Sequence, residues 1–309
     1  MINLHLCRTI QLFFIYKKIL KMNNLFKLSK KNFHKKVEFI RTLWGYNFNE
    51  SNCKKLMKID QSNGFKGYEI AYSFIDKSFL KQLNADLIRE NMNIILQVHA
   101  RDQNSFYSQI DEIFSSLNLN NIPIINCHLG YDYSDLETKS KLLIDVNNHF
   151  KSKINNNKVE LSIETHRGTI FNNPNEMIDI YNKLNCSSNI TLDLSHFVVS
   201  YERLLNNDNY PKFKRMMEIF QYTKLIHMRV STENNIQVND PLSDYYKNYN
   251  EYYCNIWQEV ISKSNKNNNL IYATLEYGPE PYSNSPQEAK NHIENNFKLL
   301  SFLNKRFNI

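Results

Sequence analysis

The chain has 309 residues, of which 42% are hydrophobic, so it can bury a large core in a single domain. The net charge of +7 comes from the first 37 residues, which hold nine Lys or Arg and no acid, leaving 29 basic against 31 acidic residues in the remainder. A near-neutral body argues against nucleic acid as a partner, and no apolar run approaches the ~20 residues of a membrane span.

Residues 1–36 are predicted to form a basic amino-terminal extension, and 37–309 a single folded domain. The extension is free of acids and contains the apolar stretch 10–16, as in a mitochondrial targeting segment, although it uses mostly Lys in place of Arg. The alternative is that translation starts at Met22. The five cysteines are widely spaced without a Cys-x-x-Cys pair, which is typical of reduced thiols. We therefore expect an intracellular protein, cytoplasmic or mitochondrial.

From residue 37 onward, strand-like and helix-like segments alternate in eight units. The expected strands are 37–43, 67–72, 93–99, 122–128, 159–164, 189–193, 224–229 and 270–276. The expected helices are 50–59, 77–90, 105–117, 136–150, 174–184, 201–205 with 212–220, 242–262, and 286–303. This order predicts an α/β fold, a (β/α)8 TIM barrel. A doubly wound open sheet is the alternative, but such a sheet would not gather residues from so many strands.

Most of the expected strands end at or beside a residue type that binds metals. These residues are His99, His128, Glu164, Asp193, His227 and Glu276. Because the carboxyl ends of barrel strands meet at one mouth, we expect these side chains to share one site. Three of the six glycines, Gly130, Gly168 and Gly278, stand two residues after a candidate, as in loops that turn sharply beside a ligand.

The last four expected strands, which are neighbours around a barrel, carry the most informative set: Glu164, Asp193, His227 and Glu276. A single carboxylate or imidazole at a strand end is more often solvated at the rim or satisfied in the core. It is less plausible that four such residues in consecutive units all have only these structural roles, so the set favours a metal site. Three carboxylates and one imidazole suit Mn²⁺, Mg²⁺ or Co²⁺, with Zn²⁺ as a further candidate.

Other residues near these strand ends are candidates for binding a substrate. His166 and Arg229 each follow a predicted ligand by two residues, so they point to the same side of a strand and are expected to line the cavity. Arg229 can bind an anionic group, unless it forms a salt bridge at the rim, and Arg167 and Arg41 are weaker candidates for that task. His196 is expected to hydrogen-bond a substrate oxygen or move a proton, and its alternative role is capping or loop packing.

Several runs of the chain resemble the xylose-isomerase-like barrel superfamily, which contains sugar isomerases, ketose 3-epimerases, inosose dehydratases and metal-dependent apurinic endonucleases. The resemblance covers about residues 37–303. It rests on the short motifs Gly67-Tyr-Glu-Ile70, Val98-His99, Cys127-His128-Leu-Gly130, Ile163-Glu164-Thr-His166, Leu192-Asp193-Leu-Ser-His196, Ile226-His227 and Leu275-Glu276-Tyr-Gly278.

The resemblance implies that the four predicted ligands, Glu164, Asp193, His227 and Glu276, form the shared metal site of the superfamily. It also implies that Glu164 and Glu276 act as acid and base on opposite sides of a bound sugar, with an enediolate stabilised by the metal. His196 and Arg229 resemble residues that steady the substrate oxygens. The expected protein is thus a divalent-metal-dependent isomerase or epimerase of a small sugar, polyol or sugar-derived acid.

An endonuclease-like phosphodiesterase is the alternative. His99 and His128 match histidines that hold further metal in the endonuclease branch, whereas in the sugar-enzyme hypothesis they bind substrate. No histidine lies between His227 and His292, so a further histidine that the endonuclease pattern requires is missing. A non-catalytic ligand-binding barrel is a third hypothesis. Substrate specificity is expected to reside in the loops 130–137, 168–175 and 230–246, whose composition does not name a substrate.

Overall fold

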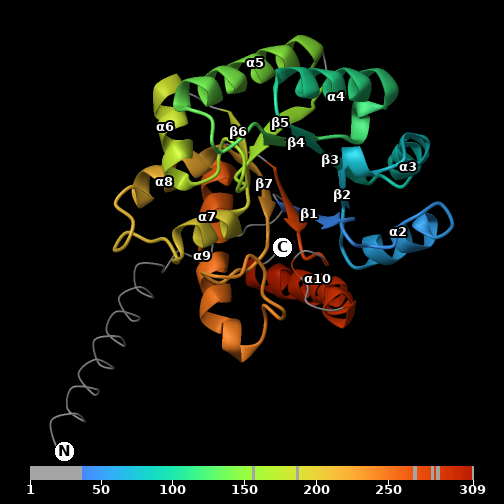
Figure 1. Cartoon of the computed structure of the whole chain (residues 1–309). Helices are drawn as coiled ribbons and strands as arrows, with labels where there is room; N and C mark the ends of the chain where they lie inside the picture. Colours follow the sequence, from blue (N-terminus) through green and yellow to red (C-terminus); the bar gives the residue numbers. More distant parts are fainter. Residues whose placement is uncertain are drawn as a thin grey trace, which may run out of the picture.

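Eight parallel strands form a closed barrel in the computed structural model, which describes residues 37–154, 157–185, 188–266, 270–279, 282 and 286–307 (Figure 1). The predicted extension 1–36 lies outside the described residues. The strands are β1 Val37–Thr42, β2 Gly67–Ala71, β3 Asn93–Ala100, β4 Ile124–Leu129, β5 Glu160–Glu164, β6 Asn189–Leu192, β7 Thr223–His227 and β8 Ile271–Leu275. Each strand pairs with the next in sequence, and β1 also pairs with β8.

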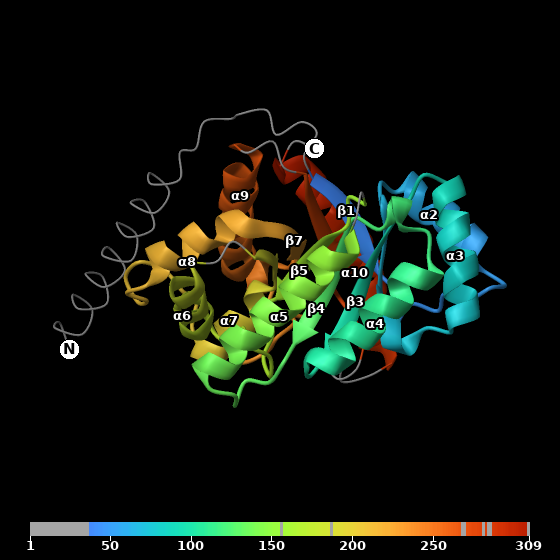
Figure 2. The ribbon, with the colours of Figure 1, turned by 90° about the horizontal axis from the view of Figure 1, so that it is seen from above.

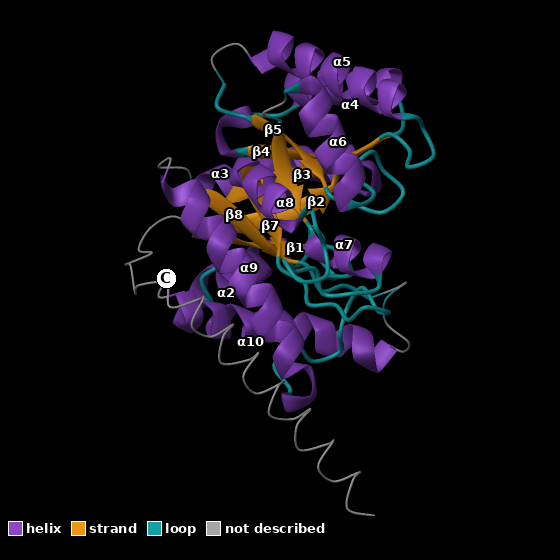
Figure 3. Ribbon diagram, turned by 90° about the vertical axis from the view of Figure 1, so that its left-hand side faces the viewer, coloured by secondary structure: helices purple, strands orange, loops and turns teal. Residues whose placement is uncertain are grey.

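The helices surround this barrel, as Figures 2 and 3 show from two further sides. They are α2 Cys53–Ser62, α3 Lys77–Arg89, α4 Gln103–Ser116, α5 Leu136–Ile154, α6 Pro174–Leu184, α7 Leu194–Tyr201, α8 Phe213–Ile219, α9 Lys247–Lys266 and α10 Pro286–Phe307. Short 3-10 turns occupy η1 Tyr72–Phe74, η2 Leu119–Asn121, η3 Phe220–Tyr222 and η4 Asp244–Tyr246. None of the described helices combines the length and the apolar character that crossing a membrane requires.

The predicted (β/α)8 TIM barrel is confirmed, and the open sheet is excluded because β1 and β8 pair over five residue positions. Most element boundaries differ from the prediction by one to several residues. β4 begins at Ile124, not at 122, because Pro123 has no backbone N–H to donate to the sheet. The helix expected at 201–205 is instead α7, which ends at Tyr201, because Asp193 caps its first turn by accepting from the Ser195 backbone N–H. The helix expected from 242 begins at Lys247, after a 3-10 turn.

The inward-facing residues of the barrel change from apolar to polar along each strand. Because side chains alternate between two faces, every second residue of a strand points inward. Four strands show the change most clearly, in the triplets Ile95–Gln97–His99, Ile124–Asn126–His128, Leu225–His227–Arg229 and Tyr272–Thr274–Glu276. Their apolar members pack into a small cluster of their own, which also contains Ile40 of β1. The barrel thus has an apolar floor beneath a polar mouth.

Candidate active site

The structure brings together the four predicted metal ligands at the carboxyl ends of β5 to β8. The ligand atoms of Asp193, His227 and Glu276 all lie within 4.8 Å of one another. Nδ1 of His227 is 3.0 Å from Oε2 of Glu276 and 3.5 Å from Oε1 of Glu164. Glu164, Asp193 and His227 are buried, and 14% of the Glu276 side chain is exposed.

Two atoms at the centre of this group lack hydrogen bonds. Nδ1 of His227 and Oε2 of Glu276 are buried, and neither has a hydrogen-bond partner in the described part of the chain, although they face each other at 3.0 Å. Oε2 of Glu276 also lies 3.3 Å from Nη2 of Arg229. Buried polar atoms are nearly always hydrogen-bonded, so an ion pair that makes no hydrogen bond fits a position where a cation can take the place of the His227 proton. The oxygen-rich donor set fits a divalent metal ion.

Acidic groups outnumber basic groups around this centre. The described charged side chains that meet there are Glu69, Glu164, Asp193, Glu276, Arg229 and His227. Burial lowers the pKa of His227, but Glu276, Glu69 and Glu164 outweigh burial and hold it well above its usual value. Without a cation, His227 therefore keeps its proton, and a bound divalent ion would take the place of that proton.

Glu164 is fixed through one of its two oxygens. Its Oε2 accepts from Nδ2 of Asn126 at 2.6 Å and from Nε2 of Gln97 at 3.3 Å, and lies 2.8 Å from Nε2 of His128. Burial raises the pKa of Glu164, but the charges of His128 and His227 outweigh it and hold this pKa well below its usual value. The carboxylate is therefore ionised, and its second oxygen is directed at His227.

Asp193 has two structural partners besides its neighbours in the cluster. Its Oδ1 accepts from the backbone N–H of Ser195 at 2.9 Å and from the Ser195 hydroxyl at 2.5 Å, and its Oδ2 accepts from Nη2 of Arg229. Burial raises the pKa of Asp193 to about 6, against the opposing charge of Arg229. Asp193 can ligate a metal while keeping Arg229, because a carboxylate oxygen has two lone pairs.

Sequence reasoning missed Glu69 on β2, which is buried beside His227. Its Oε1 and Oε2 lie 3.1 and 3.0 Å from Nε2 of His227, and Oε1 also accepts from Nδ2 of Asn126 at 3.0 Å. A carboxylate on Nε2 keeps a proton on that nitrogen and turns Nδ1 toward the metal position. Glu69, Gln97 and Asn126 could have been found from the sequence, because each is a polar residue at an inward position of an otherwise apolar strand.

The imidazoles of four histidines follow one another in a row that begins at the mouth of the barrel. The centroids of successive rings are 4.6 Å apart from His99 to His128, 4.2 Å from His128 to His166, and 3.9 Å from His166 to His196. Burial, together with the charge of His128, lowers the pKa of His99 to about 4 and that of His166 to about 3. These two imidazoles are therefore neutral at physiological pH and can donate or accept hydrogen bonds.

His196 lies behind the cavity surface. It is buried, its Nε2 is 3.2 Å from Nη2 of Arg229, and it is not among the residues that line the cavity, whereas His166 and Arg229 are. The predicted contact of His196 with a substrate oxygen stays a prediction. In this structure its imidazole contacts Arg229, which in turn faces Glu276.

The two weaker arginine candidates have different positions. Arg41 does not line the mouth, so its predicted role in binding an anionic group was wrong. Its guanidinium pairs with Asp60 on α2 at 3.0 Å and packs 4.0 Å from the ring centroid of Tyr46. It occupies an outward position of β1, one residue away from the inward ones. Arg167 is exposed at the rim, where its Nη2 donates to the hydroxyl of Tyr282 at 3.0 Å.

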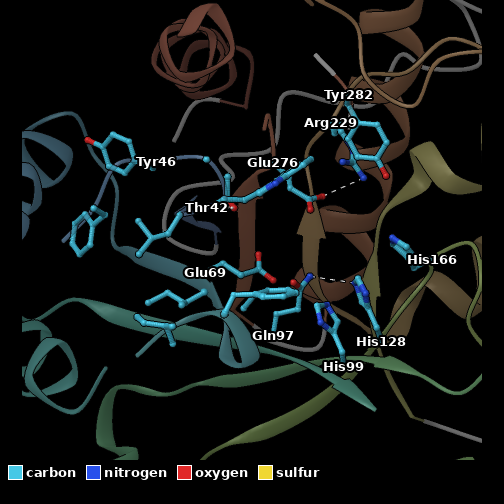
Figure 4. Close-up of a pocket in the computed structure, with 18 of the residues that line it drawn as sticks. Thr42, Tyr46, Glu69, Gln97, His99, His128, His166, Arg229, Glu276 and Tyr282 are labelled. Atoms are coloured by element: carbon cyan, nitrogen blue, oxygen red, sulfur yellow. Dashed lines mark hydrogen bonds and ion pairs between the residues drawn. The ribbon is translucent and has the colours of Figure 1, made fainter. Parts of the chain in front are cut away.

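A cavity of about 630 Å³ opens above the carboxylates, within the range of small-molecule sites (Figure 4). The polar residues that line it include Thr42, Glu69, Gln97, His99, His128, His166, Arg229 and Glu276. Glu276 therefore faces the space for a substrate, whereas Glu164, Asp193 and His227 lie beneath it.

Neither a known protein family nor a curated protein matches the sequence. Several solved structures are similar to the structure of this chain. A xylose isomerase-like TIM barrel protein from Mycobacterium smegmatis, in complex with magnesium, is 13% identical over 88% of this chain and 99% of its own, with a TM-score of 0.52. The D-allulose 3-epimerase of Methylomonas sp., in complex with D-allulose, is 12% identical over 88% and 98%, with a TM-score of 0.53. The chain has the fold of the xylose isomerase-like TIM barrel proteins.

A third similar structure has a different activity in its name. The probable 3-DHS dehydratase AsbF of Bacillus anthracis is 12% identical over 85% of this chain and 98% of its own, with a TM-score of 0.55. The predicted resemblance is therefore confirmed for the fold, which proteins of different named activities share.

Proposed function

We propose that the protein is a divalent-metal-dependent isomerase or epimerase that acts on a small sugar, polyol or sugar-derived acid. The observation that carries this proposal is the convergence of Glu164, Asp193, His227 and Glu276, with Nδ1 of His227 and Oε2 of Glu276 left without hydrogen bonds. The epimerase solved with D-allulose and the barrel protein solved with magnesium support it.

Mn²⁺, Mg²⁺ or Co²⁺ is the favoured ion and Zn²⁺ the next, because three of the four proposed ligands are carboxylates. When bound, such an ion would act as a Lewis acid on substrate oxygens and so lower the cost of removing a proton from the adjoining carbon. Oε1 of Glu164 and Nδ1 of His227 would hold it together with one oxygen each of Glu276 and Asp193.

The side chains of this cluster would then move and steer the proton. Burial raises the pKa of Glu276, but Arg229 and His227 outweigh it and bring it to about 2, so Glu276 is ionised and can accept a proton from a substrate carbon. Glu164 also faces Nδ1 of His227, at 3.5 Å, and we assign to it the return of the proton. Arg229 and the neutral imidazole of His166 line the same cavity and can bind substrate oxygens.

The test is metal analysis of the purified protein, followed by assays on a panel of ketoses, aldoses and inososes. We expect one divalent ion per chain and a turnover that falls at least 100-fold in Glu164→Gln and in Glu276→Gln. Glu90→Gln, a change at an exposed glutamate, is the matched control and keeps full turnover. Unchanged turnover in both site variants would refute the proposed roles of the two glutamates.

An endonuclease-like phosphodiesterase remains the second candidate, because one observation favours it. The ligand atoms of His128, Glu164 and His166 also lie within 4.8 Å of one another, so the site can hold a second ion beside the first. Cleavage of abasic-site DNA by protein loaded with several zinc ions would support this function. One ion per chain without cleavage would exclude it.

A further inference from the structure

The cavity has two chemically different ends. The polar end lies over β3 to β8 and contains the histidines, Arg229 and Glu276. The other end, the apolar arm, lies beside β1 and β2 and is lined by Leu43, Trp44, Phe48, Ile70, Ile75 and Phe79. We propose that, within the proposed substrate class, the preferred substrate is a polyol or sugar-derived hydroxy-carbonyl compound that carries an aryl or alkyl group, which binds in the apolar arm. This proposal rests on the proposed metal site at the polar end.

The two ends are continuous and face each other. In Figure 4, Tyr46 of the β1–α2 loop lies across the cavity from His128 and His166, with Thr42 and Glu69 between them. A compound whose oxygens bind over Glu276 would therefore project its remaining atoms past Thr42 toward the apolar arm. One end of the cavity is thus suited to the polar part of a substrate and the other end to an apolar part.

The carboxylate beside the apolar arm is already engaged. The Asp76 carboxylate caps α3 by accepting from the Phe79 backbone N–H at 2.9 Å and from the Ser78 hydroxyl at 2.5 Å. The ring of Tyr46 packs against the guanidinium of Arg41, with Cζ 4.0 Å from the ring centroid. Sugar hydroxyls placed in the apolar arm would lose hydrogen bonds to water without replacing them, which opposes binding of a free sugar there.

The wall of the apolar arm is also held in place by the fold. The ring of Phe48 packs 4.9 Å from that of Tyr68 and 6.4 Å from that of Phe79, centroid to centroid. Tyr68 is buried on β2 and its hydroxyl donates to Asp60 at 2.8 Å. The apolar arm therefore exists before a ligand arrives, and a preformed aromatic slot binds an apolar group with little ordering cost.

The experiment compares hydroxamates on the Mn²⁺-loaded protein by calorimetry. Acetohydroxamate presents the two chelating oxygens alone, and benzohydroxamate, phenylacetohydroxamate and 4-phenylbutyrohydroxamate present the same oxygens with a phenyl group at increasing reach. We expect at least one aryl compound to bind about tenfold or more tightly than acetohydroxamate, because its phenyl group is buried. 4-Hydroxybutyrohydroxamate, which has a polar tail, should gain nothing.

Two variants locate the effect. Ile75 lines the apolar arm and is partly exposed, so Ile75→Ser should fold and reduce the preference for the aryl compound. Phe48→Asn should reduce it further, and Ile144→Ser, on the partly exposed outer face of α5, should leave it unchanged. Aryl and acetyl compounds that bind within twofold of each other would overturn the apolar arm proposal. If acetohydroxamate itself fails to bind, the metal site is wrong and both proposals fall.

Discussion

Glu69→Gln is the most informative single change at this site. Among the described residues, Glu69 alone bonds to Nε2 of His227, the nitrogen that faces away from the proposed metal position. The carboxylate serves two buried donors, Nε2–H of His227 at 3.0–3.1 Å and Nδ2 of Asn126 at 3.0 Å. Glutamine has the same shape but one acceptor and one NH₂ group. If its oxygen takes the place of Oε1, which both donors reach, its NH₂ group stands where Oε2 faces Nε2 of His227, and His227 loses its charged partner.

The size of the effect follows from these contacts. A hydrogen bond to a charged group is worth about 1.5–3 kcal/mol, or roughly 10- to 150-fold in a binding constant. Changes at residues that orient a metal ligand cost about 10- to 100-fold in affinity. We therefore expect the Kd for Mn²⁺ to rise 10- to 100-fold in Glu69→Gln, while turnover at saturating Mn²⁺ stays within a few-fold because the four proposed ligands remain.

The assay is calorimetric titration of the metal-free protein with Mn²⁺, with thermal unfolding as a check on folding. Glu38→Gln is the matched control, because Glu38 also accepts from an asparagine side chain, Asn93, on the next but one strand, and is not among the residues that line the cavity. A Kd for Mn²⁺ in folded Glu69→Gln within twofold of the parent protein would refute the positioning role. A loss of turnover that saturating Mn²⁺ does not restore would place Glu69 in the reaction itself.

Three further predictions follow from the charges. The pKa of His227 is raised well above its usual value, so the metal must displace a proton at neutral pH. The affinity for Mn²⁺ should therefore rise by up to about tenfold per pH unit between pH 6 and 8. An affinity that does not change over this pH range would contradict a protonated His227. Adding Mn²⁺ at about 100 times its Kd should stabilise the fold by about 2.7 kcal/mol, seen as a higher Tm that a chelator reverses. Asp60→Asn should lower the free energy of unfolding in urea by about 3–5 kcal/mol, since it leaves the buried guanidinium of Arg41 without its counter-charge; a loss below about 1 kcal/mol would show that water reaches Arg41.

The barrel and the strands that carry the site were predictable from the amino-acid pattern. Apolar runs that recur with a strand–helix period define eight units, and only a closed parallel sheet brings the ends of so many strands to one mouth. Glu164, Asp193, His227 and Glu276 were predictable because each ends or directly follows such a run. The segment after Asp193 was predicted wrongly. Asp193 caps α7, so a helix occupies the segment that was expected to be a loop and ends where the helix 201–205 was expected to begin.

Which groups these side chains contact could not be predicted from the amino-acid pattern. The two-residue period of a strand shows that Glu69 points inward, but its contact with His227, 158 residues away in sequence, depends on how the barrel closes. The same holds for His196, which packs behind Arg229 and not on the cavity surface. The division of the cavity into a polar end and an apolar arm likewise depends on loops from β1 and β2 folding beside strands from the rest of the chain. Contacts between distant segments are set by register and packing, which a linear pattern does not encode.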